Sequence, residues 1–154
     1  MNEKKIQILV VDDNVDITTL IAIHLGEEGY GMSVRNDGDS AVDLLESMKI
    51  DLLLLDVTMP GKSGFDVLEE IKKLKNTENI DIPVIMVTAK SELADIDRAL
   101  ELGATAYIVK PFRVELLLSK IHEVLMETGK LGVAQSDETT LSKFGVAAAE
   151  MENS

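Results

Sequence analysis

Short apolar runs alternate along this chain with longer segments whose apolar residues have helical spacing. Four runs stand out and one is weaker; in order they cover residues 6–11, 31–35 (the weak one), 51–55, 82–87 and 106–109. They are short and contain little polar alternation, which is typical of strands buried on both faces of a parallel sheet. The pattern therefore predicts five strands.

The segments between and after these runs predict five helices. Their expected ranges are 15–28, 39–48, 64–75, 91–102 and 114–128. Three of them are followed by a glycine where helices commonly end: Gly29, Gly103 and Gly129. Ser91 is the expected N-cap of the fourth helix.

Strand and helix follow each other five times, which predicts a doubly wound α/β fold because such crossovers are right-handed and place helices on both faces of the sheet. The composition after Gly129 shifts to small and polar residues. Four apolar residues there have the spacing of a helical seam: Leu141, Phe144, Ala148 and Met151. We expect one domain over residues 1–128 and a C-terminal tail over 129–154 that forms a short helix or a linker.

The charge balance narrows the range of partners. The 154 residues include 28 acidic and 15 basic side chains, for a net charge of -13. This excess disfavours nucleic acids, which need a basic surface, and anionic membranes. The first apolar run is too short for a secretory signal or a membrane span. We therefore expect a cytoplasmic protein that makes no direct contact with nucleic acid or membrane.

Cysteine is absent, which excludes disulfides, thiolate nucleophiles and iron–sulfur clusters. The two histidines are expected to be structural. His24 lies at the edge of an apolar stripe that includes Leu20. His122 and Glu123 are similar to the pair at the phosphorylated histidine of sensor kinases, but they fall within the predicted fifth helix, which favours a plain helical role.

Polar side chains follow four of the predicted strands: Asp12 and Asp13, then Asp56, Thr88 and Lys110. The carboxyl ends of parallel strands form the ligand-binding edge of such a sheet. Three carboxylates at one edge repel each other and remain ionised together only beside a cation. An all-oxygen site suits Mg²⁺, with Mn²⁺ as a substitute. With a lysine for a phosphoryl oxygen, these are the parts of an aspartyl-phosphate site.

Four segments carry a resemblance to a known family: VVDDN at 10–14, LLLLDVTMPGKSGFDVL at 52–68, VIMVTAK at 84–90 and GATAYIVKPF at 103–112. In this order, they resemble the receiver domain of two-component response regulators. The resemblance covers residues 5 to about 128. It implies a flavodoxin-like, CheY-like fold with a five-stranded sheet in the order 2-1-3-4-5 and five helices.

The resemblance also implies a function and a metal site. The chain is expected to be a phosphoacceptor response regulator, with Asp56 as the residue that is phosphorylated. Asp12, Asp13 and Asp56 are expected to hold Mg²⁺ together with the backbone carbonyl of Thr58. The expected chemistry is limited to self-phosphorylation and loss of the phosphoryl group, so the chain is not expected to be an enzyme for a separate substrate.

The resemblance implies a switch around the same site. The Thr88 hydroxyl and the Ala89 backbone amide are expected to bind the phosphoryl group, and Lys110 is expected to pair with its oxygens. Tyr107 matches the aromatic residue that moves inward with the threonine, although a fixed, half-buried tyrosine is the structural alternative. Pro111 is expected to follow a cis peptide bond.

The implied partners are a sensor histidine kinase or phosphotransfer protein and a downstream protein target. The expected output surface consists of the fourth helix, fifth strand and fifth helix. Its charged residues Asp97, Arg98 and Lys120 suit either a homodimer or a solvated surface, and the tail is a second candidate for a dimer contact. Thr58 and Lys90 flank the site at positions that influence phosphoryl lifetime in this family.

Two other functions fit the sequence less well than a receiver domain does. A phosphohydrolase of the haloacid-dehalogenase type needs a second aspartate two residues after the nucleophile, where this chain has Thr58. A degenerate receiver that only binds a partner would lack an acid, the lysine or the phosphoacceptor, and all of these are present.

Overall fold

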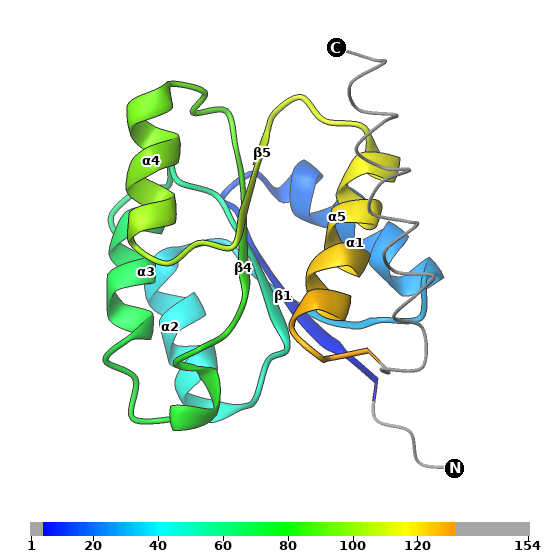
Figure 1. Ribbon diagram of the computed structural model, residues 1–154, viewed down its shortest axis with the longest axis horizontal. Helices are drawn as coiled ribbons and strands as arrows, with labels where there is room; N and C mark the ends of the chain where they lie inside the picture. The colour runs from blue at the N-terminus through cyan, green and yellow to red at the C-terminus, as the bar shows by residue number, and fades with distance from the viewer. Residues whose placement is uncertain (1–4, 132–154) are drawn as a thin grey trace.

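The computed structural model describes residues 5–131, and these form alternating strands and helices (Figure 1). The strands are β1 (Gln7–Val11), β2 (Gly31–Arg35), β3 (Leu52–Leu55), β4 (Val84–Thr88) and β5 (Ala106–Val109). The helices are α1 (Val15–Glu27), α2 (Gly38–Ser47), α3 (Gly64–Ile71), α4 (Leu93–Glu101) and α5 (Val114–Glu127), with a short 3₁₀ helix, η1 (Thr77–Asn79).

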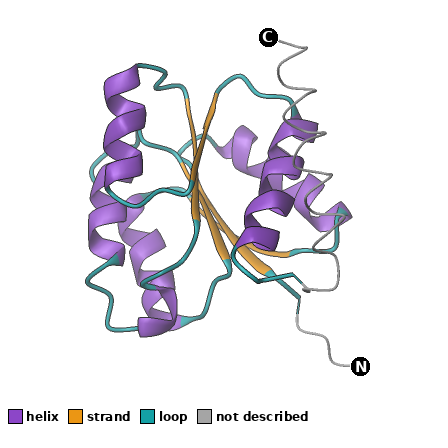
Figure 2. Ribbon diagram, in the orientation of Figure 1, coloured by secondary structure: helices purple, strands orange, loops and turns teal. Residues whose placement is uncertain are grey.

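The five strands form one parallel sheet in the order β2-β1-β3-β4-β5, as predicted. Helices α1 and α5 lie on one side of the sheet, and α2, α3 and α4 lie on the other (Figure 2). The weakly predicted strand is β2, an edge strand whose residues are all partly exposed. Its position explains its weak apolar signal.

Each face of the sheet has its own hydrophobic core because successive strand residues point to opposite faces. In β1, Leu9 and Val11 pack toward α2, α3 and α4, whereas Ile8 and Val10 pack toward α1 and α5. Strand β3 divides its four leucines in the same way. Burial on both faces accounts for the continuous apolar runs in the sequence.

Several element ends differ from the predicted ones. Helix α3 ends at Ile71 rather than at residue 75, and η1, which was not predicted, follows it. Strand β4 begins at Val84, after Pro83, which has no N–H to donate to a ladder. The predicted cap at Ser91 is wrong: α4 begins at Leu93, and its N-cap residue is Glu92, whose side chain forms no cap hydrogen bond.

The predicted glycine stops are confirmed. Gly29, Gly103 and Gly129 have φ of +89°, +107° and +75°, a left-handed conformation that is commonly found just past a helix end. The predicted place of Leu20 in the buried stripe is wrong, since it is 43% exposed. His24 is half-buried, and its Nδ1 lies 3.3 Å from a carboxylate oxygen of Glu27.

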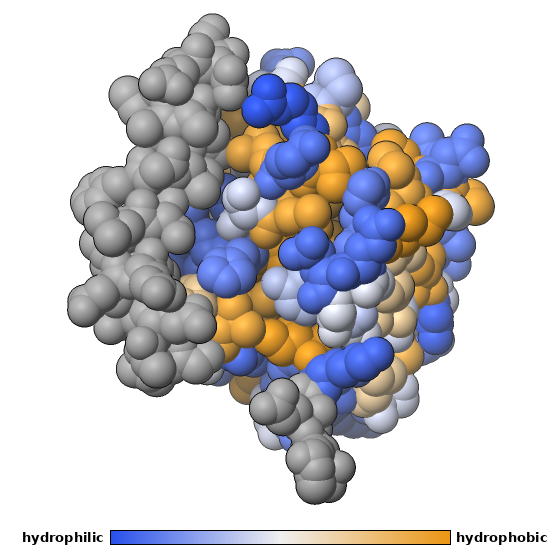
Figure 3. Space-filling view, turned by 90° about the vertical axis from the view of Figure 1, so that its right-hand side faces the viewer, coloured by the Kyte–Doolittle hydropathy of each residue, from blue (hydrophilic) through white to orange (hydrophobic). Residues whose placement is uncertain are grey.

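The side of the molecule where α1 and α5 lie shows apolar surface between polar side chains (Figure 3). Val15 and Ile23 of α1 are more than half exposed. Leu131, the last described residue, packs against the core beneath this side.

Within residues 5–131, no helix has the length and apolar character to cross a membrane. The predicted tail helix through Leu141, Phe144, Ala148 and Met151 lies outside the described residues.

Candidate functional site

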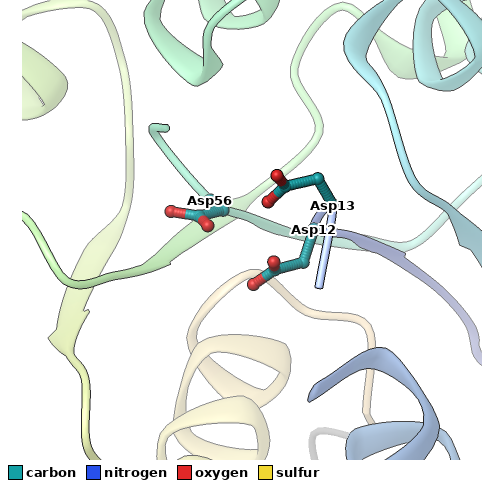
Figure 4. Close-up of side chains that lie close together, drawn as sticks. All are labelled: Asp12, Asp13 and Asp56. Atoms are coloured by element: carbon teal, nitrogen blue, oxygen red, sulfur yellow. The ribbon is translucent and has the colours of Figure 1, made fainter. Parts of the chain in front are cut away.

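Three carboxylates lie together at the carboxyl ends of β1 and β3 (Figure 4). Val11 of β1 is in register with Leu55 of β3, so the residues that follow, Asp12 and Asp56, are neighbours. One oxygen from each of Asp12, Asp13 and Asp56 lies within 4.8 Å of the other two. Asp12 and Asp56 are 2% and 6% exposed, whereas Asp13 is exposed.

Lys110 reaches this cluster from the end of β5. Its Nζ lies 2.6 Å from Oδ2 of Asp12 and 3.2 Å from Oδ2 of Asp56, so it donates to both buried carboxylates. The peptide bond between Lys110 and Pro111 is cis. The predicted site residues Asp12, Asp56 and Lys110, which follow three different strands, therefore meet at one point.

The pKa values of Asp12 and Lys110 are both raised, but for different reasons. Burial raises the pKa of Asp12, and the negative charge of Asp56 adds to this, against hydrogen bonds from Lys110 and the Asn14 backbone. Burial also opposes the charged form of Lys110, but its hydrogen bond to Asp12 and the charge of Asp56 outweigh this and raise the pKa of Lys110. The ammonium of Lys110 thus remains charged between two acids.

The loop between β3 and α3 holds Asp56 from the other side. Oδ1 of Asp56 accepts a hydrogen bond of 3.3 Å from the backbone N–H of Thr58, and Gly64 donates one of 2.8 Å to the Val57 carbonyl. A Cβ at Gly64 would lie 2.3 Å from the backbone oxygen of Asp56. The capping box of Ser63 then starts α3.

A second group of site residues lies at the end of β4. The Thr88 side chain is fully buried, and its Oγ1 accepts a hydrogen bond of 3.3 Å from the N–H of Lys90. The hydroxyl of half-buried Tyr107 donates to the Lys90 carbonyl over 2.8 Å. Ala89, between Thr88 and Lys90, is exposed. The Lys90 backbone therefore connects the threonine hydroxyl with the tyrosine hydroxyl.

Two asparagines that contact the site were not identified from the sequence. Asn14 caps α1 with its side chain, and its N–H donates to Oδ1 of Asp12 over 2.9 Å. Its place just before a predicted helix is a cap signal that could have revealed it. Asn36, just after β2, donates from Nδ2 to the Asp12 carbonyl over 2.8 Å. No local pattern indicates this contact, because it joins residues 24 positions apart.

The donor set fits a hard divalent cation. All of the clustered ligand atoms are carboxylate oxygens, and hard cations such as Mg²⁺ prefer oxygen ligands. Asp13 is exposed, which leaves the cluster open to solvent on one side. The arrangement can therefore bind a cation and an anionic group beside a buried carboxylate.

Comparison with known proteins agrees with this geometry. Residues 8–122 match the response regulator receiver domain family. The transcriptional regulatory protein CpxR of Escherichia coli (strain K12) is 43% identical over 119 residues, which cover 77% of this chain and 49% of that protein. The probable transcriptional regulator ycf27 of Guillardia theta is 38% identical over 128 residues, which cover 83% of this chain and 48% of that protein. The chain spans about half the length of these relatives.

Solved structures show the same fold. A CheY-like receiver domain protein from Methanospirillum hungatei JF-1 superposes with a TM-score of 0.76 at 32% identity, covering 82% of this chain and 98% of that one. The chemotaxis protein CheY4 of Vibrio cholerae superposes with a TM-score of 0.74 at 27% identity, covering 79% of this chain and all of that one.

Proposed function

The chain belongs to the response regulator receiver domain family of two-component signalling, and from this we propose that Asp56 accepts a phosphoryl group from a sensor histidine kinase or a phosphotransfer protein. The observation that carries the proposal is the position of Asp56. Its carboxylate is buried beside two further carboxylates and within 3.2 Å of the Lys110 ammonium. This is a nucleophile next to a positive charge.

The proposed transfer is a single displacement at phosphorus. A carboxylate oxygen of Asp56 forms the new P–O bond, the P–N bond to the donor imidazole breaks, and its electron pair stays on the imidazole nitrogen. The Lys110 ammonium then turns from the carboxylates to the phosphoryl oxygens and reduces the charge repulsion. Receiver domains of this family bind Mg²⁺ at an acidic pocket, and bound Mg²⁺ supplies further positive charge at those oxygens. Asp12, Asp13, Asp56 and the Thr58 carbonyl would hold it.

Loss of the phosphoryl group completes the cycle. The aspartyl phosphate is a mixed anhydride that water cleaves, which returns the Asp56 carboxylate and inorganic phosphate. Thr58 and Lys90 are both exposed beside the site, where their side chains can influence the approach of water. This self-limited cycle acts on no separate substrate.

The hydrogen bonds around Lys90 support a switch. Thr88 uses its hydroxyl oxygen as an acceptor from Lys90, which leaves its O–H to donate to a phosphoryl oxygen, as the Ala89 amide also would. A movement of Thr88 toward the phosphoryl group would displace Lys90 and with it the partner of Tyr107. We propose that the position of Tyr107 reports phosphorylation in this way.

The proposed output surface comprises α4, β5 and α5. Three of its apolar side chains are exposed: Leu93 (72%), Leu100 (46%) and Val109 (37%). Among its charged residues, Arg98 stacks over the Phe65 ring of α3 at 4.3 Å from the centroid, and Lys120 pairs with Glu123 over 3.4 Å. These contacts leave the apolar side chains available to a downstream protein or a second copy of the chain. We place this exchange in the cytoplasm, without direct contact between residues 1–128 and nucleic acid or membrane.

Intact-mass measurement tests the proposed phosphorylation. Purified protein with Mg²⁺ and acetyl phosphate should gain the mass of one phosphoryl group, and Asp56→Asn should gain none. Asp81→Asn is the matched control because it removes the same charge from an exposed position before β4, at the opposite edge of the sheet. An unmodified wild-type protein, or equal modification of Asp56→Asn, would refute the assignment.

A further inference from the structure

Both the backbone N–H and the backbone carbonyl of Asp12, just beyond the end of β1, form hydrogen bonds. Its N–H donates to the Arg35 carbonyl over 3.2 Å, and its carbonyl accepts from Asn36 Nδ2 over 2.8 Å. Strand pairing between β1 and β2 ends at Val11 and Arg35. The side-chain amide of Asn36 therefore adds a rung beyond the end of the ladder.

Asp13 shows the opposite situation. Within residues 5–131, no hydrogen bond or ion pair holds its carboxylate, although this carboxylate belongs to the cation cluster. The direction of its Cα–Cβ bond, from which the carboxylate extends, is set by the backbone between two peptide planes. The plane of the Asp12–Asp13 peptide is held through the carbonyl that accepts from Asn36. The plane of the Asp13–Asn14 peptide is held because its N–H donates to Oδ1 of Asp12.

We propose that Asn36 is a positioning residue that aims the Asp13 carboxylate into the cation site by holding the Asp12–Asp13 peptide plane. The inference rests on the proposed Mg²⁺ site and adds to it a residue that directly follows β2, a strand whose end supplies none of the clustered carboxylates. The hydrogen bond from Asn36 goes to the Asp12 backbone carbonyl and not to a carboxylate, so its amide acts through the backbone of Asp12. Partners that orient metal ligands typically change metal affinity by one to two orders of magnitude when they are removed.

Titration of the full chain with Mg²⁺ by calorimetry tests the proposal. Asn36→Ala should raise the Kd for Mg²⁺ about tenfold, at the lower end of that range because the contact acts through the backbone. Acetyl phosphate should give the same maximal phosphorylation rate at saturating Mg²⁺, with the half-maximal Mg²⁺ concentration raised by the same factor. If Asn36 only stabilised the fold, the half-maximal Mg²⁺ concentration would not rise while the maximal phosphorylation rate stayed the same.

A measurement without metal isolates the orientation itself. In Mg²⁺-free protein, Asn36→Ala should shift the backbone amide NMR signal of Asp13 and leave that of Asp56, on another strand, in place. The matched control is Asn76→Ala. It removes a similar hydrogen bond, from Nδ2 to the Leu45 carbonyl over 3.0 Å, and should leave the Kd for Mg²⁺ unchanged.

The possible outcomes separate this inference from the proposed function. A wild-type protein that neither binds Mg²⁺ nor becomes phosphorylated refutes the proposed function. A functional wild type with an unchanged or lower Kd in Asn36→Ala, or with an equal loss in Asn76→Ala, overturns the role of Asn36 alone.

Discussion

Replacing Gly64 with alanine probes the closest backbone approach in the site. Gly64 is the first residue of α3, and its N–H donates to the Val57 carbonyl. A Cβ there would lie 2.3 Å from the Asp56 carbonyl oxygen and 2.9 Å from Cα of Val57. Both contacts are backbone atoms, so no side chain can rotate away. Either α3 or the end of β3 must move.

The size of the effect follows from these distances. Nonbonded carbon and oxygen atoms favour separations near 3.5 Å, so the backbone must shift by about 1 Å. Overpacking of this kind costs about 1–3 kcal/mol, and weakening the hydrogen bond from Gly64 to Val57 adds about 1 kcal/mol. The better helix propensity of alanine returns at most about 1 kcal/mol. We expect Gly64→Ala to lower the free energy of unfolding by about 1–4 kcal/mol.

Urea unfolding followed by circular dichroism measures this change, with Gly26→Ala as the matched control. Gly26 lies in α1, and a Cβ there would meet only the flexible end of Met32, at 3.4 Å. Its replacement should be neutral or stabilise by up to about 1 kcal/mol through helix propensity. Gly64→Ala should also slow phosphoryl uptake from acetyl phosphate, because relief of the clash displaces Asp56.

An unfolding free energy of Gly64→Ala within about 0.5 kcal/mol of wild type, the usual range for a substitution without a specific contact, would refute the reasoning. The same holds if both glycine variants lose equal stability. Either result would mean that the β3–α3 loop adjusts without strain.

Three further results are expected. Asn79→Ala should lower the free energy of urea unfolding by about 2–4 kcal/mol, because the fully buried Asn79 side chain forms hydrogen bonds with two backbone carbonyls and one backbone N–H. A loss below about 1 kcal/mol would contradict this. The hydrogen bond from the Ser63 N–H lowers the pKa of Asp66, so this hydrogen bond stabilises the fold above the unfolded pKa of the carboxyl, and the stabilisation is lost as pH falls through the lower folded pKa. The difference in stability between wild type and Asp66→Ala should therefore shrink below about pH 4. A difference that widens there would be inconsistent with this role. Mg²⁺ at ten times its Kd should stabilise the wild type by about 1.4 kcal/mol in the same assay, and an equal gain in Asp13→Asn would argue against the site.

The fold was largely predictable because its signals are local. Each strand is an apolar run since it is buried on both faces, and the stops at Gly29 and Gly103 follow from a backbone conformation that glycine tolerates. Errors occurred where local preferences were weak or where tertiary contacts decided. Ser91 is a good cap residue by type, yet the chain begins α4 two residues later.

The candidate site was predictable only as a set of residues. Asp12, Asp13, Asp56 and Lys110 could be named because parallel strands direct their carboxyl ends to one edge. Which of them touch is a property of the tertiary structure. The ammonium of Lys110 donates to Asp12 and Asp56 but not to Asp13, because the sheet register and the burial of the two acids determine its reach.

The sequence by itself thus determined the alternation of strands and helices, the sheet edge where Asp12, Asp13, Asp56 and Lys110 meet, and the all-oxygen chemistry of the carboxylate cluster. These depend on residue type and spacing within short segments. The tertiary structure alone decided the contacts of Asn36 and Gly64, since each depends on the distance between backbone segments that are not adjacent in the chain. Such distances result from packing of the whole domain, and no window of the sequence contains them.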